Sequence, residues 1–234
     1  MLHEAWPAYE QREHDGWVLR HAAGVTKRAN SVLPLGMPAD LDDAVETAER
    51  FYASRGRASI FSMGVSAPAG LDGALAERGY ERVDPTFVMA APVLSAVPAE
   101  HEVLVKDAPW AGWMESWWGV DERFGEDVEV AGRICAGVPA LYAAVVEDGV
   151  AVSVGRGVPQ RQPGSGTTLG LYCMATLPSA RRRGLARSVI RALVAASGAT
   201  SAYLVTTEGN TAAHGLYRGE GFEVAGRYHY RVKA

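Results

Sequence analysis

The spacing of apolar positions changes along the chain between that of helices and that of buried strands, and this predicts an α/β (α+β) protein. Residues 40–54 carry apolar side chains at helical spacing, and an Arg-Gly pair ends the run. Shorter apolar runs without that spacing predict strands. The expected helices are 40–54, 70–78, 110–118, 184–197 and 211–218, and the expected strands are 58–63, 83–91, 102–106, 141–146, 150–154, 169–176, 202–207 and 223–232.

Two stretches without periodicity predict connections between these elements. Residues 92–100 are rich in Pro and Ala, and we expect a linker there. Residues 158–168 are rich in Gly, Pro, Gln and Thr, and we expect a loop. The linker predicts two domains, residues 1–96 and residues 97–234.

The two predicted domains resemble each other. Residues 76–81 (Ala-Glu-Arg-Gly-Tyr-Glu) match residues 218–223 (Arg-Gly-Glu-Gly-Phe-Glu), with 142 positions between Gly79 and Gly221. The same offset superimposes the preceding elements without a gap, which indicates one unit used twice. The alternative is chance, because Gly followed by an aromatic residue is common after a helix.

The copies differ at positions that carry chemistry. Arg181, Gly184, Asn210 and Tyr217 of the second copy correspond, in that order, to Ala39, Asp42, Pro68 and Leu75 of the first. The second copy is therefore the candidate for a functional site.

Residues 178–186 (Pro-Ser-Ala-Arg-Arg-Arg-Gly-Leu-Ala) follow a predicted strand and begin a predicted helix. Backbone N–H groups at a helix start lack intrahelical partners, and the helix dipole favours an anion there. Gly184 lets the backbone approach a ligand, and three arginines add positive charge. This pattern is typical of a pyrophosphate site; the alternative is an Arg-rich, solvated helix start. Walker and dinucleotide-binding glycine patterns are absent from the sequence.

This Arg-x-x-Gly-x-Ala loop, with Asn210, Tyr217 and the Gly-Phe pair at 221–222 after it, resembles the coenzyme A-binding half of the GNAT superfamily of N-acetyltransferases. The resemblance covers residues 102–234 and is most specific over 169–222. It implies two GNAT-like units, each with a mixed, mostly antiparallel central sheet flanked by helices, the first unit being degenerate and without a coenzyme A loop. It also implies acetyl-CoA as co-substrate. The cofactor-binding residues that it implies are Met174, Ala175 and Thr176 for the pantetheine amides, Arg181, Arg182, Arg183, Gly184, Leu185 and Ala186 for the pyrophosphate, and Asn210 for the pantetheine arm.

Acetyl transfer to an amine requires a base for the amine and an acid for the departing thiolate. Tyr217 matches the family position of the tyrosine that protonates the thiolate; a core tyrosine is the alternative. Many family members place a Glu near the strand that here ends at 173–174, and this chain has none. Glu208 is therefore our candidate base, while Tyr172, Glu115 and a chain of waters remain alternatives.

The acceptor site is less defined by the sequence. The Trp-rich stretch 110–118 and the acidic stretch 121–127 occupy the family's variable helices, although core packing and a solvated face explain them as well. We expect a small-molecule amine (an amino acid, a polyamine or an amine-bearing antibiotic) rather than a protein lysine or N-terminus. A non-catalytic acyl-CoA sensor or structural protein is the alternative from another class.

Composition narrows the partners further. Apolar residues make up 48% of the chain, and the net charge of −4 argues against nucleic acid as a partner. The two cysteines, Cys135 and Cys173, belong to no metal-binding cluster, so we expect no metal and no disulfide framework. Without a signal peptide or a long apolar run, we expect a cytoplasmic monomer or homodimer that does not bind membranes.

Overall fold

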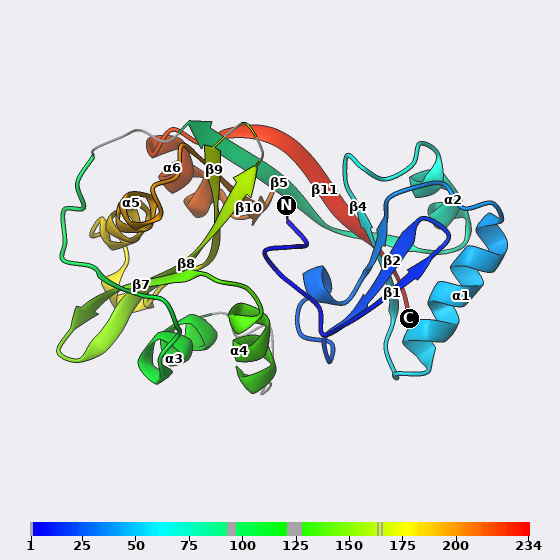
Figure 1. Ribbon diagram of the computed structural model, residues 1–234, viewed down its shortest axis with the longest axis horizontal. Coiled ribbons are helices and arrows are strands. Elements are labelled where there is room, and N and C mark those ends of the chain that lie inside the picture. Colours follow the sequence, from blue (N-terminus) through cyan, green and yellow to red (C-terminus); the bar gives the residue numbers. More distant parts are fainter. Residues whose placement is uncertain (1, 93–96, 121–127, 163, 165) are drawn as a thin grey trace. The chain divides into compact units, whose positions relative to one another are not determined.

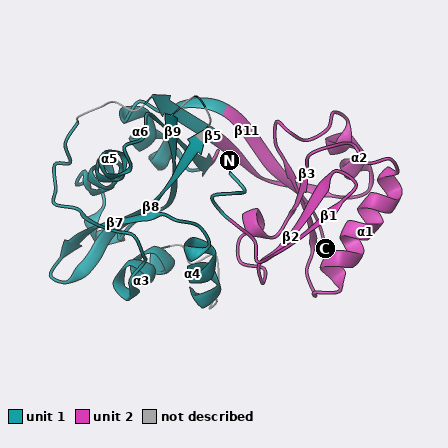
Figure 2. Cartoon of the chain, viewed as in Figure 1, with its two compact units in different colours: residues 1–6, 88–206, 210–225 teal, residues 7–87, 207–209, 226–234 magenta. Residues whose placement is uncertain are grey.

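The chain divides into two compact units, each assembled from separate stretches of sequence (Figure 2). The computed structural model describes residues 2–92, 97–120, 128–162, 164 and 166–234. Unit 1 is formed by Met1–Trp6, Val88–Thr206 and Asn210–Ala225, and unit 2 by Pro7–Phe87, Thr207–Gly209 and Gly226–Ala234. These units differ from a continuous division at residues 96 and 97, which stays a prediction about the repeat.

Unit 1 is built on a mixed sheet covered by helices on both faces (Figure 1). Its strands follow the order β10-β9-β8-β7-β6, in which β9 and β10 are parallel and the other pairs antiparallel. Helix α5 packs on β7, β8 and β9, while α3 packs on β8 and β9 from the other face. The elements are β6 (Leu104–Lys106), α3 (Ala111–Val120), α4 (Val128–Ala136), β7 (Leu141–Glu147), β8 (Val150–Gln162), β9 (Gly166–Thr176), the 3-10 helix η3 (Pro178–Ala180), α5 (Leu185–Ser197), β10 (Ser201–Thr207) and α6 (Thr211–Gly219).

Unit 2 is built on the strands β1-β2-β3-β4-β11, which pair in that order. Strands β3 and β4 are parallel, and the other pairs are antiparallel. Its core gathers apolar side chains of α1, α2 and the strands around Trp17 and Phe61. The elements are β1 (Glu10–His14), β2 (Trp17–His21), the 3-10 helix η1 (Lys27–Ala29), β3 (Val32–Pro34), α1 (Leu41–Ala53), β4 (Ser59–Met63) and α2 (Leu71–Glu77).

Two long strands each begin in one unit and end in the other. Strand β5 (Glu81–Pro92) follows α2, but from Val88 onward it belongs to unit 1, beside β10. Strand β11 (Glu223–Lys233) follows α6, but from Gly226 onward it belongs to unit 2, where it pairs antiparallel with β4. Each unit therefore contains part of a strand that the sequence pattern alone assigns to the other half of the chain.

Both units share one order of elements, while the sequence duplication itself stays a prediction. An antiparallel pair (β2 and β3, or β8 and β9) leads into a strand–helix–strand crossover (β3-α1-β4, or β9-α5-β10) with parallel strands. A second helix and a long strand then follow in each case. The prediction of mixed, mostly antiparallel strand pairing flanked by helices is confirmed for each unit.

The predicted loop at 158–168 is wrong, because β8 continues to Gln162 and β9 already begins at Gly166. Cross-strand pairing overrides the loop-like composition here: Val158 lies opposite Gly170, and Gln160 lies opposite Thr168. The sequence reading also missed α4 and the strands of residues 10–34. In the predicted linker, Pro92 belongs to β5, and residues 93–96 lie outside the described residues.

Candidate functional site

The loop between β9 and α5 presents unpaired backbone donors, as the sequence predicts. Arg182 and Gly184 both have left-handed backbone conformations, with φ of 66° and 80°, and α5 begins directly after Gly184. Within the described part of the chain, the N–H groups of Gly184, Leu185 and Ala186 have no hydrogen-bond acceptor. A turn followed by a helix start directs these donors and the positive helix end toward one point. The loop therefore has the backbone geometry of an anion site.

The three arginines of this loop are held differently. Arg181 donates from Nε to the carbonyl oxygen of Thr176 at 3.2 Å, which ties the loop to the end of β9. Arg183 forms a two-point ion pair with Glu147, at 2.6 and 2.9 Å, and this pairing lowers the pKa of Glu147. Arg182 is exposed and forms no ion pair with another described residue. Arg181 and Arg182 thus retain most of their donors for an anion.

Residues 100 and 101 lie against the start of α5. Ser188 Oγ accepts hydrogen bonds from the backbone N–H groups of Glu100 and His101, both at 3.2 Å. His101 Nε2 lies 3.0 Å from the carbonyl oxygen of Arg183. The Glu100 carboxylate pairs with Arg191 at 3.1 Å, so part of its charge is balanced. These contacts fix one wall of the anion site.

Strands β9 and β10 pair over only part of their length. Their parallel register runs from Ser201 and Thr168 to Leu204 and Leu171, whereas β9 continues to Thr176 and β10 to Thr207. The last residues of β9, including the predicted Met174, Ala175 and Thr176, therefore have an edge without strand pairing on the β10 side. Free amide groups along such an edge suit a ligand that carries amides of its own.

A bulge marks the point where β9 leaves β10. The register between β8 and β9 shifts between Val154 and Arg156, and Cys173 has a φ of 53°. Gly155 makes room for the Met174 side chain, since a Cβ on Gly155 would lie 2.6 Å from Met174 Sδ. Bulges of this kind redirect side chains and interrupt pairing. Apart from a glycine in β8, no sequence pattern indicated this bulge.

Tyr217 lies buried on α6 with its ring against Phe222, at a centroid distance of 6.1 Å. Its hydroxyl has no hydrogen-bond partner among the described residues. Burial alone raises the pKa of Tyr217 to about 12. The phenol is therefore protonated at neutral pH and retains its proton for donation.

Asn210 and Glu208 already have structural partners. Asn210 caps α6, since its Oδ1 accepts a hydrogen bond from the N–H of Ala213 at 3.2 Å. Glu208 belongs to unit 2 and pairs with Arg227 at 3.3 Å. The role of Asn210 in cofactor binding and that of Glu208 in catalysis stay predictions.

Aromatic side chains gather on the α3 side of β9. Trp6 stacks on Tyr172 at 5.8 Å between ring centroids and meets Trp117 edge to face at 6.1 Å. Trp113 is fully buried, so core packing accounts for it. The acidic stretch 121–127 lies outside the described residues.

Sequence reasoning missed Arg156, which is fully buried on β8 opposite Tyr172. Its guanidinium donates to the carbonyl oxygens of Ala5 at 3.0 Å and Cys135 at 2.7 Å, and it has no carboxylate partner among the described residues. A buried cation held by backbone oxygens is costly unless its geometry is good. The available signal was an Arg between two glycines, but this residue lay between the predicted strand 150–154 and the predicted loop 158–168.

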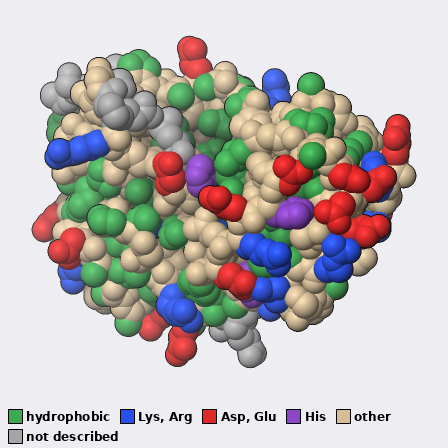
Figure 3. All heavy atoms as spheres, turned by 45° about the vertical axis from the view of Figure 1, so that its right-hand side comes forward, with side chains coloured by type: hydrophobic (Ala, Val, Ile, Leu, Met, Phe, Trp, Pro, Cys, Tyr) green, Lys and Arg blue, Asp and Glu red, His purple; other side chains and the backbone are tan. Residues whose placement is uncertain are grey.

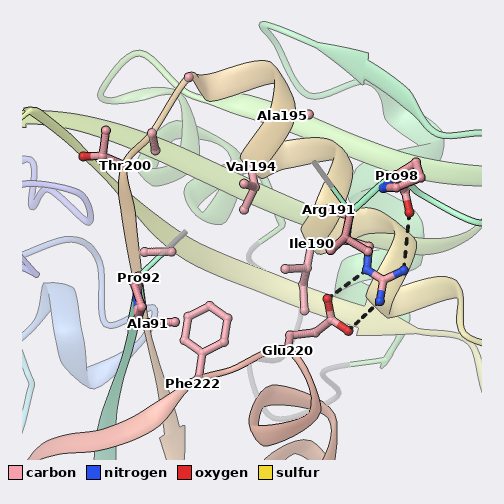
Figure 4. Close-up of a pocket in the computed structure, with 14 residues that line it drawn as sticks. Ala91, Pro92, Pro98, Ile190, Arg191, Val194, Ala195, Thr200, Glu220 and Phe222 are labelled. Carbon is pink, nitrogen blue, oxygen red and sulfur yellow. Dashed lines mark hydrogen bonds and ion pairs between the residues drawn. The ribbon is translucent and has the colours of Figure 1, made fainter. Parts of the chain in front are cut away.

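A cavity of about 770 Å³ in unit 1 lies apart from the predicted site residues (Figure 4). It is bordered by Ile190 and Val194 of α5, by Phe222, and by the ion pair of Arg191 with Glu220. None of the predicted cofactor-binding residues lines it. The anion loop and this cavity lie at different parts of α5.

Charged side chains of both signs are interspersed on the face shown in Figure 3. Within the described ranges, no helix is long and apolar enough to span a membrane. The same ranges contain no group of His, Cys, Asp or Glu side chains arranged to hold a metal ion.

Comparisons with known proteins agree with the fold. A family model described as "Probable histone acetyltransferase Rv0428c C-terminal" matches residues 2–231. The chain is 30% identical over 98% of its length to the "Uncharacterized N-acetyltransferase YobR" of Bacillus subtilis (strain 168), of which it covers 94%.

Solved structures show the same architecture at low identity. A GCN5-related N-acetyltransferase from Kribbella flavida aligns with a TM-score of 0.70 at 20% identity, covering 97% of this chain and 90% of that one. A tandem GNAT protein from the clavulanic acid biosynthesis pathway aligns with a TM-score of 0.61 at 14% identity, covering 87% of this chain and 74% of that one. Together with the family model, these likenesses place the chain in the GNAT superfamily of N-acetyltransferases, within the family of the Rv0428c C-terminal region.

Proposed function

We propose that this N-acetyltransferase transfers an acetyl group from acetyl-CoA to the primary amine of a small molecule, at a site whose cofactor-binding residues lie in unit 1. One observation carries the proposal: β9 separates from β10 after Leu171 and Leu204, directly before an anion loop with unpaired N–H groups. An open strand edge followed by an anion site matches, in order, a ligand with amides followed by a pyrophosphate.

The predicted residues divide between these two parts. Met174, Ala175 and Thr176 offer backbone groups at the open edge, and Asn210 Nδ2 remains available while its Oδ1 caps α6. The N–H groups of residues 184–186, with Arg181 and Arg182, would hold the pyrophosphate. A backbone N–H near the bulge at Cys173 would stabilise the oxyanion.

Transfer proceeds in this proposal by direct attack. The neutral amine nitrogen attacks the thioester carbon, the carbon–sulfur bond breaks, and Tyr217 donates its proton to the departing sulfur. A phenol that is desolvated and free of hydrogen bonds from its neighbours is suited to this step, because only the sulfur competes for its proton. The amine loses its own proton to Glu208 or to a chain of waters.

The aromatic cluster around Tyr172 is filled by the chain itself, because Trp6 and Tyr172 are both buried and stack on each other. The Arg156 guanidinium lies 5.7 Å from the Trp6 ring centroid and 5.9 Å from the Tyr172 ring centroid, so the preference for a small amine rests on the sequence. The description of the matching family names a probable histone acetyltransferase, so a lysine on a protein is the competing acceptor.

The proposal is tested by an acceptor screen that follows release of free coenzyme A thiol. The panel contains amino acids, polyamines, aminoglycosides and a lysine-rich histone-tail peptide, each with acetyl-CoA and the full chain. We expect acetylation of a small amine with kcat/KM at least tenfold above that of the peptide. Faster turnover of the peptide would overturn the acceptor assignment.

The cofactor part is tested separately by titrating acetyl-CoA into the protein without an acceptor. We expect saturable binding that weakens with added salt, because a pyrophosphate contact is charged. Absence of binding would overturn the site itself. Tight binding without thiol release on any acceptor would instead support a sensor.

A further inference from the structure

The chain contains two cysteines, and the fold brings them together. Cys135 lies in the last turn of α4, and Cys173 lies at the bulge of β9. Their sulfur atoms are 3.9 Å apart, and the two thiols share a hydrogen bond. Residues 38 positions apart on different elements thus meet within reach of a covalent bond.

The backbone on each side of this pair is held in place. The carbonyl oxygen of Cys135 accepts hydrogen bonds from Tyr142 Oη and from Arg156 Nη2, both at 2.7 Å. Cys173 is held in a left-handed conformation between the paired residues of β8 and β9. A disulfide has a sulfur–sulfur distance of about 2.05 Å, so the two sulfur atoms must approach each other by about 2 Å to form the bond.

The two thiols also differ in access. Cys135 is fully buried, whereas Cys173 is only partly buried. The hydrogen bond from Cys173 lowers the pKa of Cys135, and the charge of Arg156 adds to this effect against the opposing effect of burial. One thiol is therefore accessible to a reagent, and the other is poised to react with it.

We propose that Cys135 and Cys173 are a modification site, at which a peroxide converts the two thiols to a reversible disulfide between α4 and the bulge of β9.

The chemistry balances with hydrogen peroxide as the oxidant. The Cys173 thiolate attacks one peroxide oxygen, the oxygen–oxygen bond breaks, and water and a sulfenic acid result. The Cys135 thiolate then attacks the Cys173 sulfur, the sulfur–oxygen bond breaks, and a second water leaves. Each sulfur is oxidised by one electron overall, and the peroxide is reduced to two waters.

The consequence for activity rests on the proposed function. Met174 and Ala175 follow Cys173 directly at the open edge of β9. A bond from Cys173 to α4 pulls the bulge toward the α3 and α4 face and changes the position of this edge. We therefore expect the oxidised protein to bind acetyl-CoA at least fivefold more weakly than the reduced protein.

The full chain is treated with hydrogen peroxide, alkylated and analysed by intact mass and by peptide mapping without reductant. We expect loss of two hydrogen atoms, a cross-linked peptide containing Cys135 and Cys173, and full reversal by dithiothreitol. Cys135→Ser should instead accumulate a dimedone-reactive sulfenic acid at Cys173, because its resolving thiol is gone. Cys173→Ser should leave Cys135 reduced, and thermal melts confirm that both variants fold.

Retention of both thiols in the wild-type protein would overturn the proposal, as would a disulfide formed only between two chains. Acetyl-CoA titration of the reduced protein distinguishes failure of the proposed function from failure of the disulfide proposal. If the reduced protein fails to bind acetyl-CoA, the proposed function is wrong, and the peptide map still decides the disulfide. If the linked protein binds acetyl-CoA as tightly as the reduced one, the consequence for activity is overturned.

Discussion

The carboxylate of Asp72 accepts two hydrogen bonds from the guanidinium of Arg231, at 2.8 and 2.9 Å, across 159 positions of sequence. His229 Nε2 lies 2.7 Å from the same carboxylate. Asp72 is on α2, and both partners are on β11. The contact therefore joins an early helix of unit 2 to the strand that enters this unit from the end of the chain.

Asp72→Asn should destabilise unit 2, because it removes the charge from a two-point ion pair with a largely buried arginine. We expect a loss of about 1 kcal/mol in the free energy of unfolding, since Asp72 itself is partly exposed. Glu77→Gln, at an exposed residue at the end of the same helix, is the matched control and should change little. Chemical denaturation of both variants measures the difference, and equal losses would contradict the role of the pair.

The same pair predicts a pH dependence. The hydrogen bonds from Arg231, and secondarily from His229, hold the pKa of Asp72 well below its ordinary value, against the effect of burial. A lowered pKa stabilises the fold above the unfolded pKa of about 4, and this contribution is lost as the pH falls. The stability difference between wild type and Asp72→Asn should therefore be full at pH 7 and shrink below about pH 4. A constant difference across this range would exclude the ion pair as its cause.

Gly184→Ala should weaken acetyl-CoA binding more than its cost in stability explains. Gly184 and Gly198 flank α5 with φ of 80° and 60°, so alanine is strained at both, by about 1 kcal/mol. Gly184 borders the anion site, whereas Gly198 lies at the other end of the helix. We expect Kd for acetyl-CoA to rise on the order of tenfold, about 1.4 kcal/mol, in Gly184→Ala and to stay unchanged in Gly198→Ala. Calorimetric titration decides, and similar Kd values in both variants would remove Gly184 from the site.

Tyr217→Phe should lower kcat by about 100-fold or more without changing the Kd for acetyl-CoA, because it removes only the proposed acid. Tyr80→Phe, which deletes a buried phenol hydroxyl in unit 2, is the control. Since burial raises the pKa of Tyr217 to about 12, the phenol keeps its proton through pH 10. The wild-type kcat should therefore show no alkaline decline that belongs to this residue below about pH 11. An unchanged kcat in Tyr217→Phe would assign the proton to another donor.

Arg156→Met should destabilise unit 1 by about 3 kcal/mol, because it leaves the carbonyl oxygen of Ala5 buried without a donor. Arg161→Met removes an exposed arginine from the same strand and is the matched control. Denaturant titration compares the two. A loss no greater than that of Arg161→Met would show that the buried hydrogen bonds contribute little.

The local sequence predicted those parts of the site that depend on neighbouring residues. The turn at Gly184 and the helix that begins after it follow from short-range backbone chemistry, and the structure has both of them. Apolar spacing likewise predicted α1, α5 and α6 to within two residues at each end. Helix-forming patterns are local, so they survive whatever packs around them.

Features that depend on distant pairing were not predictable in this way. The bulge at Cys173 arises from the register of β9 against β8, and the contact of Cys135 with Cys173 arises from packing of α4 on the sheet. Residues 158–162 have the composition of a loop, yet they form a strand because they pair with β9. Nothing in the sequences of β5 and β11 themselves predicts which strands they pair with.

The placement of β11 has a consequence for how the protein is made. The ribosome synthesises the chain from the N-terminus to the C-terminus, so β1 to β4 and α1 leave the ribosome long before residues 226–234. One edge of β4 then lacks its partner strand while the second half of the chain is synthesised. Unit 2, which contains the first strands to be synthesised, is therefore the last unit to be completed. Deletion of residues 226–234 would leave β4 with an unpaired edge, and such edges promote aggregation.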